Sequence, residues 1–519
     1  MNKWLRIFIK LVVIVFLVTI SVVLVSNYLV KEKVVHFLET SLPDTILQTN
    51  SSIELNVFSG TISFNNPIIE IRNLDSKNYH TKASFDKIVV EDISYWDYFL
   101  NSKIHIDGVK FIKPNIVYFK DEYKKIDSSA AVLKMHSPFI IDELNINNAK
   151  LHIYDRSKDS LLLYVENGTI NINDININKE TIIKRLPVAF KNYQFKADSI
   201  FVKANPFENL TTSNIISKNN TTHIKNIRFK TKYSRQVLSS FIKTERDHFD
   251  LVIDGMKVST LDFGFINRKL FVKTNRIEIS NSKLNIFRNK LITDDSSIKK
   301  LYSESLRAIP FNLTIDSVKI KNTNISYTEK VKEENDGGRI EFQNLDANIA
   351  NVSNTYKSPA QTTLDISGYF MRNTAFNANW SFDVNNTNDD FIFKMNMKTL
   401  EFSKINKFTE PNLKIRFNGE VKKLYFTING NKTNSIVDLK VNYEDFKILI
   451  LNKKGKQKNW FLTKIVNLFV SKDSKDKSNN FRKAITEVDR DKTKSIFNFI
   501  WVNVSHGLLK SMAGDGDKN

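Results

Sequence analysis

The chain has 519 residues, of which 41% are hydrophobic, and its formal net charge is +21. This apolar content excludes a wholly disordered chain, and the absence of cysteine excludes disulfides, thiolate nucleophiles and cysteine-ligated zinc. Lysine and arginine are spread along the chain instead of forming a patch or arm, so no nucleic-acid partner is predicted. We interpret the charge as a solvated face, with attraction to anionic lipid headgroups as the alternative.

The first predicted element is a transmembrane helix over Leu11–Val30, a run without a charged residue. Twenty residues at about 1.5 Å each span about 30 Å, the thickness of a hydrocarbon core. Three basic residues precede the run, which places the N-terminus in the cytoplasm and the rest of the chain outside it. A cleaved signal peptide would have a shorter apolar stretch and a better cleavage site. The predicted single-pass membrane anchor includes Leu11, Val15, Leu17, Val22, Leu24 and Leu29.

The body that follows, from about residue 51 to residue 451, has a dominant period of two. Ile53, Leu55 and Val57, for example, alternate with polar residues. Such alternation indicates strands with one solvated and one apolar face. Helical patterns last only one or two turns, near residues 34–38, 95–100 and 235–243.

A loose repeat recurs in this body at Ile106–Tyr118, Ile141–Ile153, Asn275–Ile286 and Ile315–Tyr327. Each copy has two apolar residues two apart, four mostly polar residues, and another apolar pair. We interpret a copy as a strand, a tight connection and a returning strand; generic antiparallel hairpins are the alternative. The apolar positions are the candidate groove lining: Val109, Phe111, Ile116, Tyr118, Leu144, Ile146, Leu151, Ile153, Ile277, Ile279, Val318, Ile320, Ile325 and Tyr327.

After Leu451 the pattern changes, and no further strand is predicted. A basic turn precedes a helix over Asn459–Val470, and a polar loop precedes a second helix over Thr493–Met512. These helices either lie on a membrane surface or, the reading that we favour, plug the open end of the sheet or dock a partner. Their predicted amphipathic faces comprise Phe461, Ile465, Leu468, Phe469, Ile496, Phe497, Ile500, Trp501, Val504 and Leu508.

The order of these elements resembles the AsmA-like family. An anchor helix is followed by a strand ending near residues 60–64 and then by Lys87–Phe119, in which Pro114 occupies the family's proline position. Ile315–Val352 resembles the family's recurring unit. The resemblance covers Met1–Val352 well and the rest loosely. No single motif in it is diagnostic.

The resemblance implies a relation to the bridge-like, or chorein-like, lipid-transfer proteins. The expected fold is mainly β: an N-terminal transmembrane helix, an elongated, curled, antiparallel-rich sheet that forms a groove, and short amphipathic helices at the C-terminus. The expected segments are 1–33 (cytoplasmic stub and anchor), 34–451 (periplasmic β body) and 452–519 (basic loop and helices). About 28 strands at about 4.8 Å would extend about 130 Å, which is short for a bridge between two membranes.

The implied function is phospholipid transfer between membranes, or outer-membrane biogenesis and maintenance. The implied location is the bacterial inner membrane, with the bulk of the chain in the periplasm. Because the sheet is short, an outer-membrane or periplasmic protein partner is expected beside the lipid cargo. The alternative is a structural or scaffolding periplasmic protein with a closed β core and no lipid cargo.

No constellation for catalysis is found in the sequence. It lacks G-x-S-x-G, H-E-x-x-H, a P-loop and G-x-G-x-x-G. His105 and His152 fall in strand patterns, and Asp107, Asp142 and Asp316 fall at strand starts and turns, where aspartate bonds the backbone. We therefore expect no enzyme activity, catalytic residue, metal or cofactor.

Overall fold

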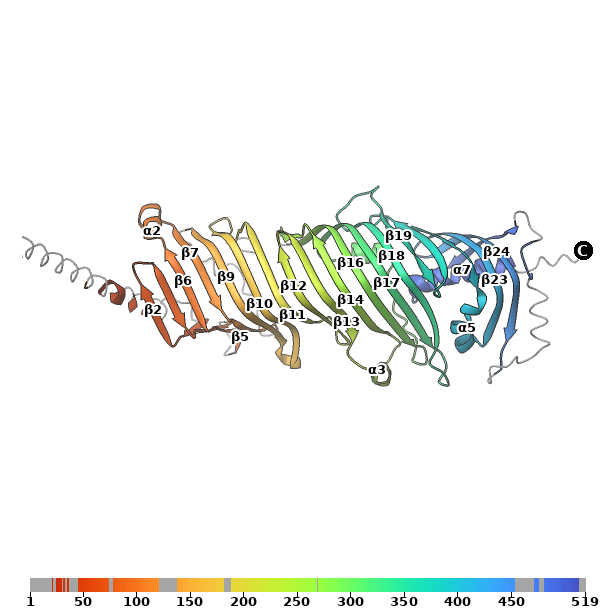
Figure 1. The fold of residues 1–519 in the computed structure, drawn as a ribbon, viewed down its shortest axis with the longest axis horizontal. Helices are drawn as coiled ribbons and strands as arrows, with labels where there is room; N and C mark the ends of the chain where they lie inside the picture. The colour runs from red at the N-terminus through yellow and green to blue at the C-terminus, as the bar shows by residue number, and fades with distance from the viewer. Residues whose placement is uncertain are drawn as a thin grey trace, which may run out of the picture. The chain divides into compact units, whose positions relative to one another are not determined.

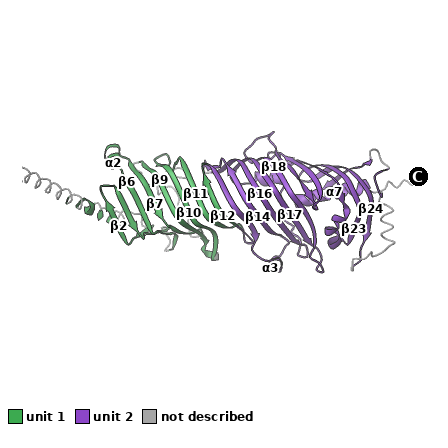
Figure 2. Cartoon of the chain, viewed as in Figure 1, with its two compact units in different colours: residues 1–204, 211–219 green, residues 205–210, 220–519 purple. Residues whose placement is uncertain are grey.

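The computed structural model describes residues 45–73, 78–120, 138–181, 188–267, 269–452, 471–475 and 480–512, with residues 21, 25–29, 31–32 and 35–36 near the N-terminus. The chain is mainly β with few helices, which confirms the predicted class. It divides into two compact units, 1–204 with 211–219 and 205–210 with 220–519 (Figure 2). The predicted segments separate anchor, β body and tail, whereas these units divide the β body itself.

Within the described residues, no helix has both the length and the apolar character needed to cross a membrane. Residues 25–29 are helical, and the Leu29 side chain is 52% exposed. The other named anchor positions, Leu11, Val15, Leu17, Val22 and Leu24, lie outside the described residues. The membrane anchor therefore stays a prediction.

Unit 1 is a sheet in which the strands before β9 form two series, and the strands of each series pair side by side (Figure 1). One series of paired strands runs β2, β3, β6, β7, β9, and the other runs β1, β4, β5, β8, β9; β10 and β11 follow β9. The elements are β1 Ile46–Thr49, β2 Ser52–Asn56, β3 Thr61–Asn65, β4 Ile68–Arg72, β5 Tyr79–Ser84, β6 Lys87–Ile93, α2 Tyr95–Asn101, β7 Ile104–Ile112, β8 Asn115–Phe119, β9 Phe139–Asp155, η1 Arg156–Lys158, β10 Ser160–Ile177 and β11 Asn192–Lys203, while β12 Glu208–Lys218 has residues in both units.

In unit 2 the strands pair in the order β13, β14, β16, β17, β18, β19, β20, β21, β23, β24, β25, and the β16–β17 pair is parallel. The elements are β13 Thr221–Thr231, α3 Arg235–Phe241, β14 Asp247–Ser259, β15 Asp262–Ile266, β16 Lys269–Asn289, α4 Tyr302–Arg307, β17 Asn312–Lys330, β18 Gly338–Ser353, β19 Thr362–Phe370, β20 Thr374–Phe382, β21 Phe391–Met397, β22 Leu400–Glu401, η2 Phe402–Lys404, α5 Asn406–Leu413, β23 Ile415–Gly430, β24 Asn434–Ile450, β25 Arg482–Asp489 and α7 Ile496–Met512.

The repeat copies do not reverse direction, which corrects the predicted strand, connection and returning strand. β7 and β8 hold the first copy, and both run parallel to β9. The copies at Ile141–Ile153 and Ile315–Tyr327 each lie within one long strand, β9 and β17. Each copy is therefore one strand direction interrupted in the middle.

The interruption is a residue with left-handed backbone in every copy. Lys113, Asn148, Asn281 and Asn322 have φ angles of 46°, 55°, 52° and 53°. Asparagine adopts this region more readily than most residues. The apolar residues on either side of it, such as Ile320 and Ile325, are five positions apart. Because five is odd, an unbroken strand would turn them to opposite faces. An extra bulged residue returns the second pair to the face of the first.

The segment after Leu451 contains a strand that the sequence analysis missed. β25 pairs antiparallel with β24, and Ala484 and Val488 are buried on one of its faces. Ile485 on the other face is 62% exposed and breaks the expected apolar–polar alternation. Because of this break and the polar residues that precede the strand, the period of two is not recognisable in the sequence of β25. The predicted helix Asn459–Val470 lies outside the described residues.

Candidate apolar groove

Apolar side chains of unit 1 form transverse rows across paired strands. Directly paired residues present their side chains on the same face of a sheet. β7 and β8 contact β9 in this way, and β9 contacts β10. The rows are Val109–Leu144–Ile172, Phe111–Ile146–Ile170, Ile116–Leu151–Val165 and Tyr118–Ile153–Leu163.

Unit 2 has rows of the same kind across β14, β16, β17 and β18. The bulges of β16 and β17 lie side by side, and Asn322 Nδ2 donates to Asn281 Oδ1 at 2.8 Å. This alignment keeps the apolar pairs on both sides of the bulges in register. The rows are Val258–Ile277–Val318–Ile349, Met256–Ile279–Ile320–Ala347, Leu251–Leu284–Ile325–Phe342 and Phe249–Ile286–Tyr327–Ile340.

All fourteen predicted lining positions fall in these rows. Val109 is 8% exposed, and the other thirteen side chains are half-buried. Half-buried apolar rows over many strands leave an apolar surface that other side chains cover only in part, and in unit 2 Ile325 and Phe342 also pack against the buried cluster of β20–β24. We call these two sets of rows the open rows.

The C-terminal part of unit 2, around β20–β25, is fully packed, unlike the open rows. Ile428, Val437, Leu439, Val441 and Tyr443 on β23 and β24 are all 0% exposed. α7 packs on β23, β24 and β25, and α5 packs on β18 and β23 (Figure 1). At Gly507 a Cβ would lie 3.0 Å from Leu439 Cδ1, so a glycine here lets α7 approach the sheet closely. We call this region the sealed core.

The sealed core also holds aromatic residues that the sequence analysis did not name. Phe376, Trp380, Phe393 and Phe426 are each at most 6% exposed. Phe393 pairs with both Trp380 and Ile428 across β20, β21 and β23. Aromatic residues at alternate positions of these strands were the available signal. They lie beyond the repeat copies on which the prediction rested.

The buried line of α7 differs from the predicted amphipathic face. Phe497 and Trp501 are 64% and 51% exposed, whereas Phe499 and Asn503 are buried. The polar Asn503 side chain is satisfied in the core, where Asn503 Oδ1 accepts a bond from Ser435 Oγ at 2.9 Å. Ile496 is buried, and Ile500, Val504 and Leu508 pack against the sealed core. Phe461, Ile465, Leu468 and Phe469 lie outside the described residues.

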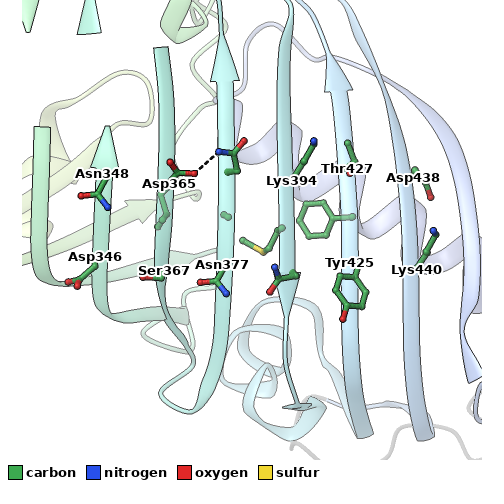
Figure 3. A pocket seen from close by; sticks show the side chains of 16 residues that line it. Asp346, Asn348, Asp365, Ser367, Asn377, Lys394, Tyr425, Thr427, Asp438 and Lys440 are labelled. Carbon is green, nitrogen blue, oxygen red and sulfur yellow. Dashed lines mark hydrogen bonds between the residues drawn. The ribbon is translucent and has the colours of Figure 1, made fainter. Parts of the chain in front are cut away.

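A separate hollow of about 660 Å³ lies over β18–β24, and most of the residues that line it have polar or charged side chains (Figure 3). Its Asn379 alternates along β20 with the buried Trp380, so it opens on the opposite face from the sealed core. Asn379 Nδ2 donates to Asp365 Oδ1 at 2.6 Å. Lys394 and Asp438 also line it. Amides and charges of this kind do not suit an acyl chain.

His105 joins α2, β7 and β9 through two carboxylates. Its Nδ1 lies 2.8 Å from Asp97 Oδ2, and its Nε2 lies 3.0 Å from Asp142 Oδ1. His105, Asp107 and Asp142 also lie close enough to share a metal ion. However, a protonated imidazole donates from both nitrogens and keeps no lone pair for a metal. The geometry therefore fits a charged clamp better than a metal centre.

The clamp shifts the pKa values of its members. Hydrogen bonds that the His105 ring donates, first to Asp97 and then to Asp142, raise the pKa of His105 above its ordinary value. Hydrogen bonds that Asp97 accepts, of which the one from His105 has the largest effect, lower the pKa of Asp97 to about 2. A raised histidine pKa contributes stability that is complete below the unfolded value of about 6.5 and is lost as pH rises through the folded pKa.

We predict that hydrogen-exchange protection of α2 falls as pH rises above about 6.5, after correction for the intrinsic exchange rate. His105→Gln should remove this pH dependence, and Asp142→Asn should reduce it. Asp107→Asn is the matched control, because Asp107 does not contribute to the pKa shift of His105. Loss of protection in Asp107→Asn, restored by added Zn²⁺, would instead indicate a metal site.

No protein-family model matches the chain, and a search of curated proteins finds no match. The AsmA-like resemblance thus rests on the order of elements in the sequence.

Proposed function

We propose that the protein is an AsmA-like, inner-membrane-anchored periplasmic protein that carries phospholipid between membranes, or otherwise maintains the outer membrane. Within each unit, the open rows would form an apolar groove. The observation that carries the proposal is the contrast within one chain. Thirteen of the fourteen predicted lining positions are half-buried, whereas five residues of the sealed core are 0% exposed.

An apolar face of this kind supplies what acyl chains need. Transfer of a methylene group out of water is favourable by about 0.8 kcal/mol. Contact with the open rows along even part of an acyl chain would therefore hold a phospholipid without a specific polar partner. Such a surface binds chains of different lengths, and its work requires no catalytic residue. The polar headgroup would remain in water at the edge of the sheet.

The sealed core favours a second candidate function, that of a structural or scaffolding protein, for the region around β20–β24. Residues around β20–β24 pack as a closed β core under α7 and α5, as a scaffolding protein would. Under the lipid-transfer proposal, this region closes one end of the apolar surface of unit 2 or docks the expected protein partner. Under the scaffolding alternative, the open rows are a half-covered structural face without cargo.

A reconstituted transfer assay tests the proposal. The full chain is inserted into donor vesicles that contain a self-quenched fluorescent phospholipid, and acceptor vesicles are added. The expected result is faster dequenching than between protein-free vesicles, without mixing of vesicle contents. A rate equal to that of protein-free vesicles would contradict lipid transfer and favour the scaffolding alternative.

A further inference from the structure

One edge of unit 1 exposes three large apolar side chains. Phe58 is 72% exposed in the turn between β2 and β3, and Trp96 and Leu100 on α2 are 76% and 73% exposed. Trp96 and Leu100 are four residues apart and lie on the same side of the helix. Large apolar side chains that are exposed together mark interaction sites with membranes or other proteins. We call these three residues the apolar rim.

The two segments of the apolar rim are joined through the backbone. Ile93 N donates to Gly60 O at 3.2 Å, just before Ser94 caps the start of α2. Gly60 has a φ of 57°, and a Cβ there would lie 2.8 Å from Ile93 N. The β2–β3 turn is thus pressed against the strand end that leads into α2. Phe58 and α2 therefore belong to the same edge of the unit.

The apolar rim is also tied to the N-terminal segment. Val57 N, next to Phe58, donates to Asn27 Oδ1 at 2.8 Å. Asn27 is three residues before the end of Leu11–Val30, which corresponds to about 4.5 Å along a helix. If that run spans a bilayer, the β2–β3 turn lies at the level of the lipid headgroups. Tyr28 is 62% exposed at the same level.

We propose that the apolar rim inserts into the headgroup region of the bilayer that holds the predicted anchor. Tryptophan is enriched at this depth because its ring is apolar and its N–H bonds water or headgroups. The carboxylates of Asp97 and Asp107 limit the insertion to a shallow depth. The rim then holds the ends of β6 and β7 against the membrane surface. This inference rests on the anchor and is independent of any lipid cargo.

The test uses the full chain, whose lack of cysteine allows single-site labelling. Phe58→Cys, Trp96→Cys and Leu100→Cys carry an environment-sensitive fluorophore in vesicles of phosphatidylethanolamine and phosphatidylglycerol. Leu47→Cys is the control, because Leu47 is 44% exposed on β1 opposite Glu70. Glu70 is ten residues beyond Gly60 through β3 and β4, which corresponds to about 30 Å.

The expected result is that lipids spin-labelled near the headgroup quench the three rim labels at least twofold more than the Leu47→Cys label. Aqueous iodide should quench the rim labels less than the control. Equal iodide quenching at all four positions would overturn the proposal. Labels shielded from iodide but unaffected by spin-labelled lipid would also overturn it, since the rim would then contact protein. Neither outcome bears on lipid transfer, which the vesicle assay reads separately.

Discussion

Replacing Ile146 with aspartate is expected to lower the rate of phospholipid transfer about tenfold. Ile146 lies in the middle of an open row, paired with Phe111 and Ile170. A carboxylate there would meet the acyl chain, and leaving such a charge without polar partners costs several kcal/mol. A loss of about 1.4 kcal/mol in binding already corresponds to a factor of ten. The reconstituted vesicle assay measures the effect.

Asn145→Asp is the matched control for this variant, because it adds the same charge at the neighbouring position. Asn145 Oδ1 accepts a hydrogen bond from Asn171 Nδ2, which an aspartate can also accept. The control should transfer lipid at the wild-type rate. Because Ile146 is half-buried beside solvent, Ile146→Asp should keep its circular dichroism spectrum. Equal transfer by both variants would mean that the open rows do not carry the lipid.

The second large effect is expected in the sealed core. Leu439→Ala should destabilise unit 2 by about 2–5 kcal/mol, because it leaves a cavity at a fully buried apolar site. Ile146→Ala should cost clearly less, since a half-buried site in an open row loses fewer contacts. Hydrogen exchange in increasing urea, read at amides of β24 and β9, measures each local cost. Equal costs at the two sites would indicate that both lie in closed cores.

Period two alone was enough to predict the strands, because one-sided burial imposes alternation on any sequence. It could not predict the direction of the chain through the repeat. A polar stretch with Asn322 fits either a turn or a left-handed bulge, since asparagine favours both. The five-residue separation of Ile320 and Ile325 was the available signal. An odd separation without reversal requires one inserted residue if both side chains are to share a face.

Long-range packing explains what the sequence analysis missed in unit 2. The helical pattern over Thr493–Met512 predicts an apolar stripe that contains Phe497 and Trp501. The sheet instead receives the side with Gly507 and Asn503, where a small residue allows close approach and a polar one finds Ser435. The periodicity of apolar residues cannot predict that a glycine or an asparagine will face the sheet.

The central claim is that the open rows hold lipid while the sealed core does not. Benzoylphenylalanine at Phe111, Ile146 or Ile320, irradiated in cells, tests it directly. Phe393 is the control, because it is only 6% exposed and the crosslinker placed there lies in the sealed core. We predict phospholipid adducts at all three open-row positions and none at Phe393. Protein-only adducts at the three positions would contradict the account and leave a β scaffold without cargo.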